Sequence, residues 1–101
     1  MKSFGDMVKQ AQKMQKQMGE LQEQLAEERF EASAGGGAVT AIVDGKQMLK
    51  SLAIRPEALK DGDASLLEDL IVAAVGEAQR ASEKQMNEKL AQLTGGFKLP
   101  F

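Results

Sequence analysis

A stripe of apolar residues runs along the first quarter of the chain at helical spacing. Its members recur every three or four positions, and they are Phe4, Met7, Ala11, Met14, Met18, Leu21 and Leu25. This spacing predicts an amphipathic helix from residue 3 to about residue 28. The apolar stripe is narrow, so it should pack against one helix or one sheet face. Ser3 is a suitable N-cap, and Asp6 three residues later completes a box-like start. Five members of the stripe form the expected core or dimer seam: Met7, Met14, Met18, Leu21 and Leu25.

The middle of the chain changes to the alternation that is typical of strands. Three short antiparallel strands are predicted, over residues 29–34, 38–43 and 46–55. Gly35-Gly36-Gly37 separates the first two strands, and Pro56 ends the third. In the third strand, Met48, Leu52 and Ile54 are expected on one face. Asp44-Gly45 indicates a two-residue hairpin turn, which would require a positive φ at Gly45.

A second long helix is predicted after the turn at residues 61–63 and extends to about Leu93. Ser65 and Glu68 have the spacing of a capping box, and Asp63 is an equally good cap. Thr94-Gly95-Gly96 should stop this helix, and the apolar segment 97–101 is expected to dock on another surface. The predicted fold is therefore α+β with the order α-β-β-β-α. It is one domain over residues 1–101, with a three-stranded antiparallel sheet between two long helices.

The length of the two helices has a consequence for assembly. A helix of about 26 residues is about 39 Å long. A compact domain of 100 residues has a radius of gyration of only about 13 Å. Both helices would extend beyond their own domain and carry their apolar stripes with them. A second copy of the chain is the expected cover, and a symmetric homodimer is the commonest solution.

Composition excludes most chemistry. The 101 residues include no His, Cys, Tyr or Trp, so the usual general base, thiol nucleophile and soft metal ligands are missing. We therefore expect no enzyme activity, metal, cofactor or small-molecule substrate. The longest apolar run, residues 70–75, is too short to span a bilayer, and the N-terminus lacks the apolar region of a secretory signal. A cytoplasmic location without membrane contact is expected.

The net charge of −2 argues against nucleic acid, but positive charge is concentrated in segments. Lys9, Lys13 and Lys16 lie at helical spacings of four and three residues, opposite the apolar stripe. A row of lysines can contact successive phosphates, although an ordinary solvated helix face has the same pattern. Arg80 and Lys84 repeat the spacing on the last helix. There the alternative is ion pairing within the helix, because acidic residues are interspersed.

Taken together, the segments resemble the YbaB/EbfC family of nucleoid-associated proteins. The resemblance covers nearly the whole chain in the right order. It rests on residues 9–15 of the first helix, Gly35-Gly36-Gly37, Asp44-Gly45-Lys46, Ile54-Arg55-Pro56, residues 67–74, Leu93-Thr94-Gly95-Gly96 and Lys98-Leu99-Pro100-Phe101. One departure is Arg55, where the family often has an acidic residue before the proline. Its effect, on DNA contact or only on the sheet edge, is left open.

The resemblance implies a bacterial homodimer whose helices project like the arms of tweezers and grip double-stranded DNA. Such proteins act on the nucleoid in the cytoplasm, with little or modest sequence preference, and they alter DNA conformation. The residues that carry over to DNA binding are Lys9, Lys13 and Lys16, followed by Arg80 and Lys84. The alternative is a protein-interaction module, in which the seam binds another helix and the lysines are only solvated.

Overall fold

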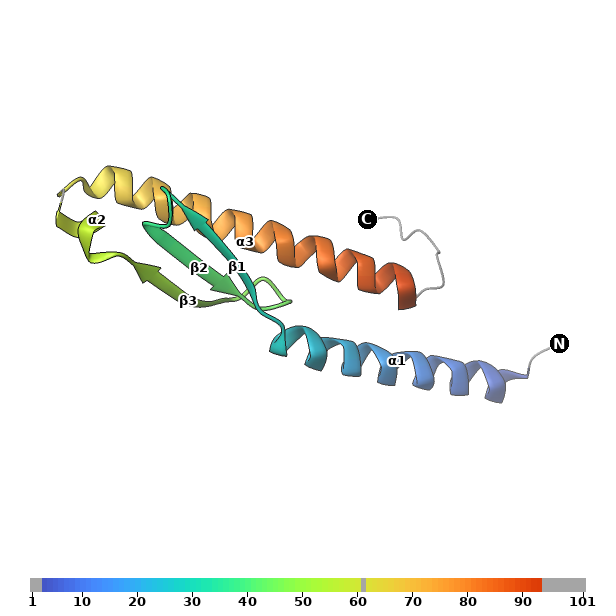
Figure 1. Cartoon of the computed structure of the whole chain (residues 1–101). Coiled ribbons are helices and arrows are strands. Elements are labelled where there is room, and N and C mark those ends of the chain that lie inside the picture. Colours follow the sequence, from blue (N-terminus) through green and yellow to red (C-terminus); the bar gives the residue numbers. More distant parts are fainter. Residues whose placement is uncertain (1–2, 61, 94–101) are drawn as a thin grey trace.

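Two long helices and a three-stranded sheet make up the protein. The computed structural model describes residues 3–60 and 62–93. The elements are α1 (Phe4–Glu27), β1 (Phe30–Ala34), β2 (Val39–Val43), β3 (Leu49–Ile54), α2 (Pro56–Lys60) and α3 (Ala64–Leu93). The predicted α-β-β-β-α order is confirmed, with the short helix α2 as an unpredicted addition (Figure 1). The predicted stop at residues 94–96 and the apolar segment 97–101 lie outside the described residues.

The ends of the long helices follow from local hydrogen bonds. At the start of α1, the Ser3 hydroxyl oxygen accepts from the Asp6 amide at 3.3 Å, which confirms the predicted cap. At its end, Arg29 Nη1 donates to the Ala26 carbonyl at 2.9 Å, so a cation satisfies one of the last carbonyls. At the start of α3, Asp63 Oδ1 accepts from the Leu66 amide at 2.9 Å. Asp63, rather than Ser65, is therefore the cap of α3.

The sheet has the order β1-β2-β3, and both pairs are antiparallel. The register of β3 on β2 shifts between Ile42 and Val43: Ile42 faces Ser51, whereas Val43 faces Leu49. Lys50 is therefore an extra residue, a β-bulge. The bulge brings Leu49 onto the same face as Leu52, although residues three apart would otherwise point to opposite faces. The expectation that Met48 would occupy this face was wrong, because it ignored the bulge.

The turn between β2 and β3 is longer than predicted. The Asp44 amide donates to the Met48 carbonyl at 2.9 Å, and the Gln47 amide donates to the Asp44 carbonyl at 3.1 Å. The positive φ, 67°, is at Gln47 and not at Gly45. Gly45 is required for a different reason: its amide donates to the Leu25 carbonyl at 2.7 Å, and a Cβ there would lie 2.6 Å from that oxygen. The turn therefore packs directly against the last turn of α1.

The core lies between one face of the sheet and α3. Small residues of α3, Ala74 and Ala78, are fully buried against Val39, Ala41 and Val43 of β2. Their size allows the helix to approach the sheet closely. Larger residues of α3 and the apolar residues of β1 pack around this centre and are half-buried. Along the chain the sheet lies between the long helices, but in space α3 is the helix that covers it, over β1 and β2 (Figure 1).

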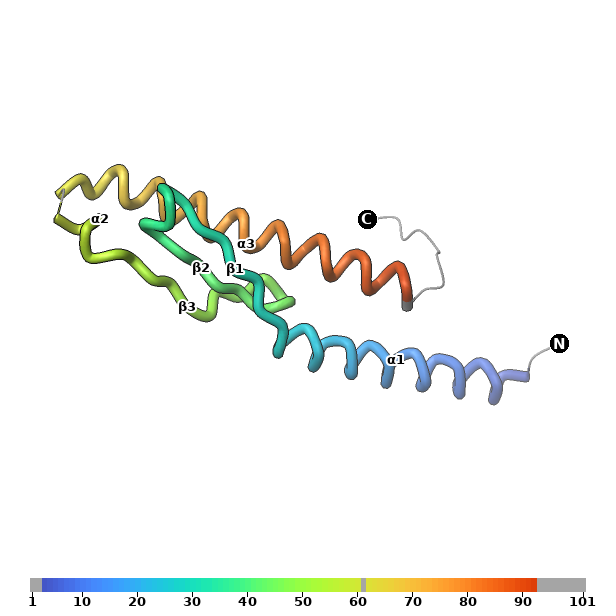
Figure 2. The backbone as a smooth tube through the Cα atoms, in the orientation of Figure 1, coloured from blue at the N-terminus to red at the C-terminus, as the bar shows by residue number. Residues whose placement is uncertain are grey.

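The molecule is elongated, with extents of 70 × 22 × 16 Å and a radius of gyration of 19.4 Å. A compact domain of this length has a radius of about 13 Å, so the predicted overhang of the helices is confirmed. Figure 2 shows α1 projecting from the end of the sheet, with the second half of α3 extending past the sheet toward it. Lys89 of α3 forms an ion pair with Glu28, which joins the base of α1 to α3.

Candidate nucleic-acid interface

The three lysines predicted to bind DNA lie on the projecting part of α1. Lys9, Lys13 and Lys16 are all exposed, and we refer to them as the lysine ridge. The ion pairs of the described residues join Lys50 to Asp44 and Lys89 to Glu28. No described carboxylate therefore lies within ion-pair distance of the lysine ridge. The ridge extends over about 10 Å of helix axis. One strand of B-DNA carries about three phosphates over that length.

The seam on the opposite side of α1 has two different environments. Leu25 is buried beside the β2–β3 turn, and Met18 and Leu21 are half-buried. Met7 and Met14, farther along the projecting helix, are 59% and 54% exposed. The base of the seam therefore packs within the chain, whereas its N-terminal half is uncovered.

A hollow of about 360 Å³ separates the base of α1 from the end of α3. Its lining is mostly polar and consists of Gln17, Glu20, Leu21, Gln24, Lys89 and Gln92. The two helices run in opposite directions here, so residues before Gln17 on α1 lie beyond this contact. The lysine ridge therefore has no neighbouring helix within the described part of the chain, and it is accessible to a large ligand.

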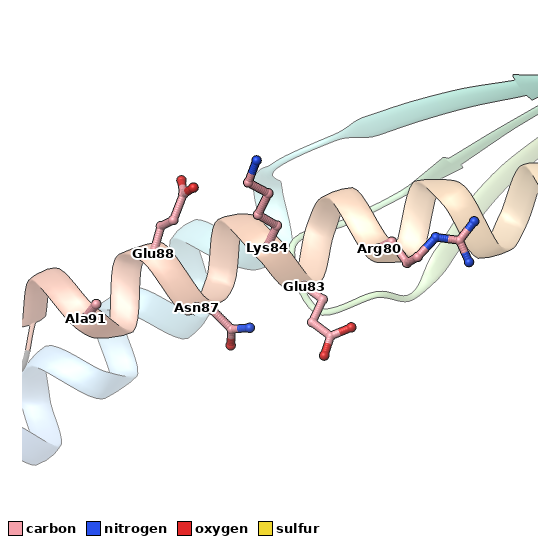
Figure 3. A pocket seen from close by; sticks show the side chains of 6 residues that line it. All are labelled: Arg80, Glu83, Lys84, Asn87, Glu88 and Ala91. Carbon is pink, nitrogen blue, oxygen red and sulfur yellow. The ribbon is translucent and has the colours of Figure 1, made fainter. Parts of the chain in front are cut away.

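The basic residues predicted on α3, Arg80 and Lys84, are also exposed. They border an open hollow along the helix, together with Glu83, Asn87, Glu88 and Ala91 (Figure 3). Lys84 and Glu88 project from one side of α3, and Glu83 and Asn87 project from the other (Figure 3). Within the described residues, neither basic side chain forms an ion pair with the acids. The alternative of intrahelical pairing is therefore not realised, although the acids still reduce the local positive field.

The structure does not bring the two basic groups together within the chain. The helices approach each other along residues 17–24 of α1 and 89–92 of α3, and Glu28, just after α1, pairs with Lys89. The lysine ridge lies beyond that contact, while Arg80 and Lys84 lie before it. Arg55 is farther still, because the register places it at the end of the sheet away from α1. There its guanidinium lies over Gly37, where a Cβ would be 2.9 Å from Nη2.

A buried carboxylate that sequence reasoning did not identify stabilises the β2–β3 turn, on which the end of α1 packs. Asp44 is 2% exposed, and its Oδ1 accepts from the Lys46 amide at 2.8 Å and the Met48 amide at 3.1 Å. Burial acts to raise the pKa of this carboxyl, but these two hydrogen bonds and the cations Lys50 and Arg29 outweigh it. Its pKa is therefore lowered from the ordinary value of 3.8.

The same turn is fastened to α3. The Ser82 hydroxyl, fully buried, donates to the Asp44 carbonyl at 2.8 Å, and Gln79 Nε2 donates to the Gln47 carbonyl at 3.1 Å. Since Gly45 also bonds to Leu25, one turn joins α1, the sheet and α3. This junction sets the direction in which the lysine ridge projects. Asp44-Gly45 showed that a turn was present, but nothing in the local sequence showed that it is buried.

Among the described residues, no group of three or more acidic side chains is placed to hold a metal ion. No helix in this part of the chain has the length and apolar character needed to cross a bilayer.

The chain is similar to several known proteins. A protein named nucleoid-associated protein from Acetivibrio thermocellus is 45% identical over 95 residues, covering 94% of this chain and 84% of the relative. One of the same name from Alkaliphilus metalliredigens is 45% identical over 98 residues, covering 97% and 86%. The crystal structure of the uncharacterized protein HP0035 from Helicobacter pylori has the same fold, with a TM-score of 0.85 at 19% identity over 93% of this chain and 99% of that one. Residues 1–97 match the family model described as the YbaB/EbfC DNA-binding family, and the chain belongs to that family.

Proposed function

We propose that this protein is a homodimeric nucleoid-associated protein that binds duplex DNA mainly through backbone phosphates and alters DNA conformation. The observation that carries the proposal is the lysine ridge, Lys9, Lys13 and Lys16, exposed and free of described ion-pair partners on a helix that projects from the body. Membership of a DNA-binding family, with relatives named for the nucleoid, supports DNA as the partner of the ridge.

Phosphates, rather than base edges, suit the chemistry of the ridge. A lysine ammonium is a compact point charge, and phosphate contacts position a protein on DNA without reading its sequence. Stacking on unpaired bases is a poor alternative, because the chain has only four aromatic residues, all Phe. We therefore expect affinity that depends strongly on salt and weakly on sequence.

A homodimer is supported by the shape of the protomer. The radius of gyration of 19.4 Å and the exposed seam residues Met7 and Met14 describe a chain that does not cover its own apolar surface. Two protomers related by a two-fold axis would also present two lysine ridges to one duplex. The number of phosphate contacts would then double without any new residue.

The test compares two double variants that remove the same charge. Lys9→Ala with Lys13→Ala removes two cations from the ridge, and Arg55→Ala with Lys60→Ala removes two exposed cations from the other end of the sheet. Binding to duplex DNA is titrated at several salt concentrations, and circular dichroism checks the fold. Each lost phosphate contact should reduce the slope of log affinity against log salt by about 0.9, once per subunit.

The proposal predicts a flatter slope and weaker binding for the ridge variant on every duplex sequence, with the control close to wild type. Equal slopes for all three proteins would exclude the ridge as the DNA surface. The protein-interaction alternative would then be preferred, because docking of an apolar seam onto another helix is insensitive to salt.

A further inference from the structure

A groove lies beside α2 and the start of α3, at the end of the molecule farthest from the projecting part of α1 (Figure 1). One half is a hollow of about 260 Å³. Its lining includes Asp63 and otherwise consists of small or aliphatic residues: Gly35, Ala38, Ala58, Leu66, Leu67 and Leu70. A second hollow, lined by Arg55 and Glu57, adjoins it, because Ala38 and Ala58 border both. We call the two hollows together the α2 groove.

The walls of the apolar hollow are fixed by the backbone. Gly35, with a φ of 66°, brings the β1–β2 turn against Leu70, since a Cβ there would lie 3.0 Å from each methyl carbon of the leucine. The Ala58 amide donates to the Arg55 carbonyl at 3.0 Å, which fastens the first turn of α2 to the end of β3. The hollow is therefore formed before any ligand arrives, and filling it needs little rearrangement.

Arg55 places an oriented cation next to this hollow. Its amide donates to the Ala38 carbonyl at 2.9 Å, and its guanidinium lies over Gly37, where the absence of a Cβ leaves space for it. Among the described residues no carboxylate lies within ion-pair distance of the guanidinium, although Glu57 lines the same hollow. The planar fork of a guanidinium matches the two oxygens of a carboxylate. The α2 groove therefore combines an apolar pocket with an available site for one carboxylate.

The charges around the α2 groove do not suit a nucleic acid. Glu57 lines the hollow of Arg55, and Asp63 lines the apolar one. A chain of phosphates would have to pass both acids and would be repelled by them. A single carboxylate needs only the fork of Arg55. The ligand that fits is therefore apolar, with one negative charge beside the apolar part.

The size of the hollow and its surroundings favour a polypeptide over a small molecule. A volume of about 260 Å³ is below the roughly 300–1,000 Å³ of small-molecule pockets. Leu59 of α2 and Leu66 of α3 are 59% and 51% exposed beside the groove. A small acid that filled the hollow would leave these leucines in water, whereas a peptide segment would cover them. One apolar side chain anchored in such a hollow is the usual centre of a protein interface.

We propose that the α2 groove binds a segment of a different protein in which an apolar anchor residue stands beside an aspartate or glutamate. The anchor fills the hollow between Ala58, Leu66 and Leu70, and the carboxylate accepts two parallel hydrogen bonds from Arg55. The α2 groove and the lysine ridge lie at opposite ends of the molecule (Figure 1), so this partner can be held while α1 contacts DNA. Arg55, whose effect the sequence left open, is thereby assigned to a protein partner.

The probe is a short capped peptide, acetyl-Gly-Phe-Glu-Gly-amide, titrated into the isotopically labelled full-length protein and followed by NMR. Binding should shift the backbone amides of Gly37, Ala38, Ala58 and Leu67, which belong to or border the α2 groove. Replacing the glutamate of the peptide by glutamine, or its phenylalanine by alanine, should weaken binding about tenfold in each case. The absence of localised shifts at the groove would overturn the proposal.

Two variants of the protein test the same contacts against matched controls. Arg55→Gln removes the cation, and Leu66→Asp places a charge at the apolar hollow, in the first turn of α3 where an acid is compatible with the helix. The controls are Lys46→Gln and Val72→Asp, which change exposed residues that do not line the groove. Each groove variant should weaken the peptide about tenfold, with both controls at the wild-type affinity and circular dichroism unchanged.

The other occupants of the groove give different results, and each of them would overturn the proposal. Phenylpropionate that binds as tightly as the peptide would assign the groove to a small acid. Duplex DNA that displaces the peptide and loses affinity in Arg55→Gln would assign it to nucleic acid. A change of mass in sedimentation for Leu66→Asp, but not for Val72→Asp, would assign it to contact between copies of the chain. Failure of the lysine ridge to bind DNA is measured separately and leaves the peptide result unaffected.

Discussion

Gly45 is a position at which the packing leaves no space for a side chain. A Cβ there would lie 2.6 Å from the Leu25 carbonyl oxygen and 2.8 Å from Leu25 Cα, and both are backbone atoms that cannot rotate away. Gly45→Ala should therefore destabilise the protein by about 1–3 kcal/mol, as overpacking usually does. Urea unfolding measures the change.

The matched control is the same substitution at Gly19. This residue is in the interior of α1, and a Cβ there would meet nothing within 4 Å. Gly19→Ala should be neutral or stabilising by up to about 1 kcal/mol, because alanine favours a helix over glycine. Equal changes in unfolding free energy for the two variants would mean that the turn does not approach α1 as described.

Asp44 makes the free energy of unfolding depend on pH. Its carboxyl is buried, which acts to raise its pKa, but the amides of Met48 and Lys46 and the nearby cations lower that pKa below 3.8. A lowered pKa in the folded state means that the carboxylate stabilises the fold above its unfolded pKa, and that this contribution disappears as the pH falls through the folded value. Asp44→Asn removes the titration. Wild type should be more stable than this variant at neutral pH, and the difference should shrink below about pH 4.

The comparison is made by chemical unfolding at a series of pH values from neutral to acid. Ser33→Ala is a useful reference, because it alters a hydrogen bond to Thr40 without changing a charge. Its difference from wild type should stay constant with pH. A difference between wild type and Asp44→Asn that is likewise constant would show that this carboxylate does not contribute through its charge.

For single residues, local patterns located the caps and turns, but they did not predict hydrogen-bond partners that are distant in sequence. Ser3 was identified as a cap because its partner, Asp6, is three residues away. Ser82 was not identified, because its hydroxyl bonds to Asp44, which is distant in sequence. The error at Gly45 has the same origin: Asp-Gly is a strong local signal for a tight turn, but contact with Leu25 decided the geometry.

At the scale of elements, periodicity predicted the long helices and the strands, because each repeats its pattern over several residues. The helix α2 was missed, since Pro56–Lys60 is barely more than one turn and has no repeat to detect. The bulge at Lys50 was also missed, since one inserted residue is visible only in the pairing with β2. Both omissions concern β3 and the connection that follows it, where the sequence has no pattern that repeats.

The last helix supplies a prediction about the weaker basic group. Arg80→Ala with Lys84→Ala should reduce the salt dependence of DNA binding by less than the change at the lysine ridge does. The physical reason is that Glu83 and Glu88 border the same hollow and oppose phosphate there. The measurement is the same salt titration on duplex DNA.

Neutralising the acids gives the complementary control on α3. Glu83→Gln with Glu88→Gln should strengthen binding at low salt, because it removes repulsion while keeping side chains of similar size. If neither double variant changes the affinity, α3 does not face the DNA. The contact would then be confined to α1.

At the scale of the whole molecule, sequence predicted the overhang of the helices but not the direction of α1. Length alone required a helix longer than the domain, and the extents of 70 × 22 × 16 Å confirm it. The direction depends on the junction of Leu25, Gly45, Asp44 and Ser82, which brings together three distant parts of the sequence. The resulting shape separates the body, formed by the sheet and α3, from the lysine ridge on a projecting helix (Figure 1).

The proposed homodimer predicts that thermal stability depends on protein concentration. If two copies fold together, unfolding releases two chains, and mass action favours the folded dimer at higher concentration. A tenfold increase in protein concentration stabilises the dimer by about 1.4 kcal/mol. The midpoint of thermal unfolding should then rise by about 3 °C for two chains of this length. Scans of wild type over a hundredfold concentration range provide the measurement. Val72→Asp, exposed on the outer face of α3, should keep the same dependence. A midpoint that stays fixed over the whole range would show that a single chain folds alone. The small core around Val39, Ala41 and Val43 would then be sufficient to stabilise one chain.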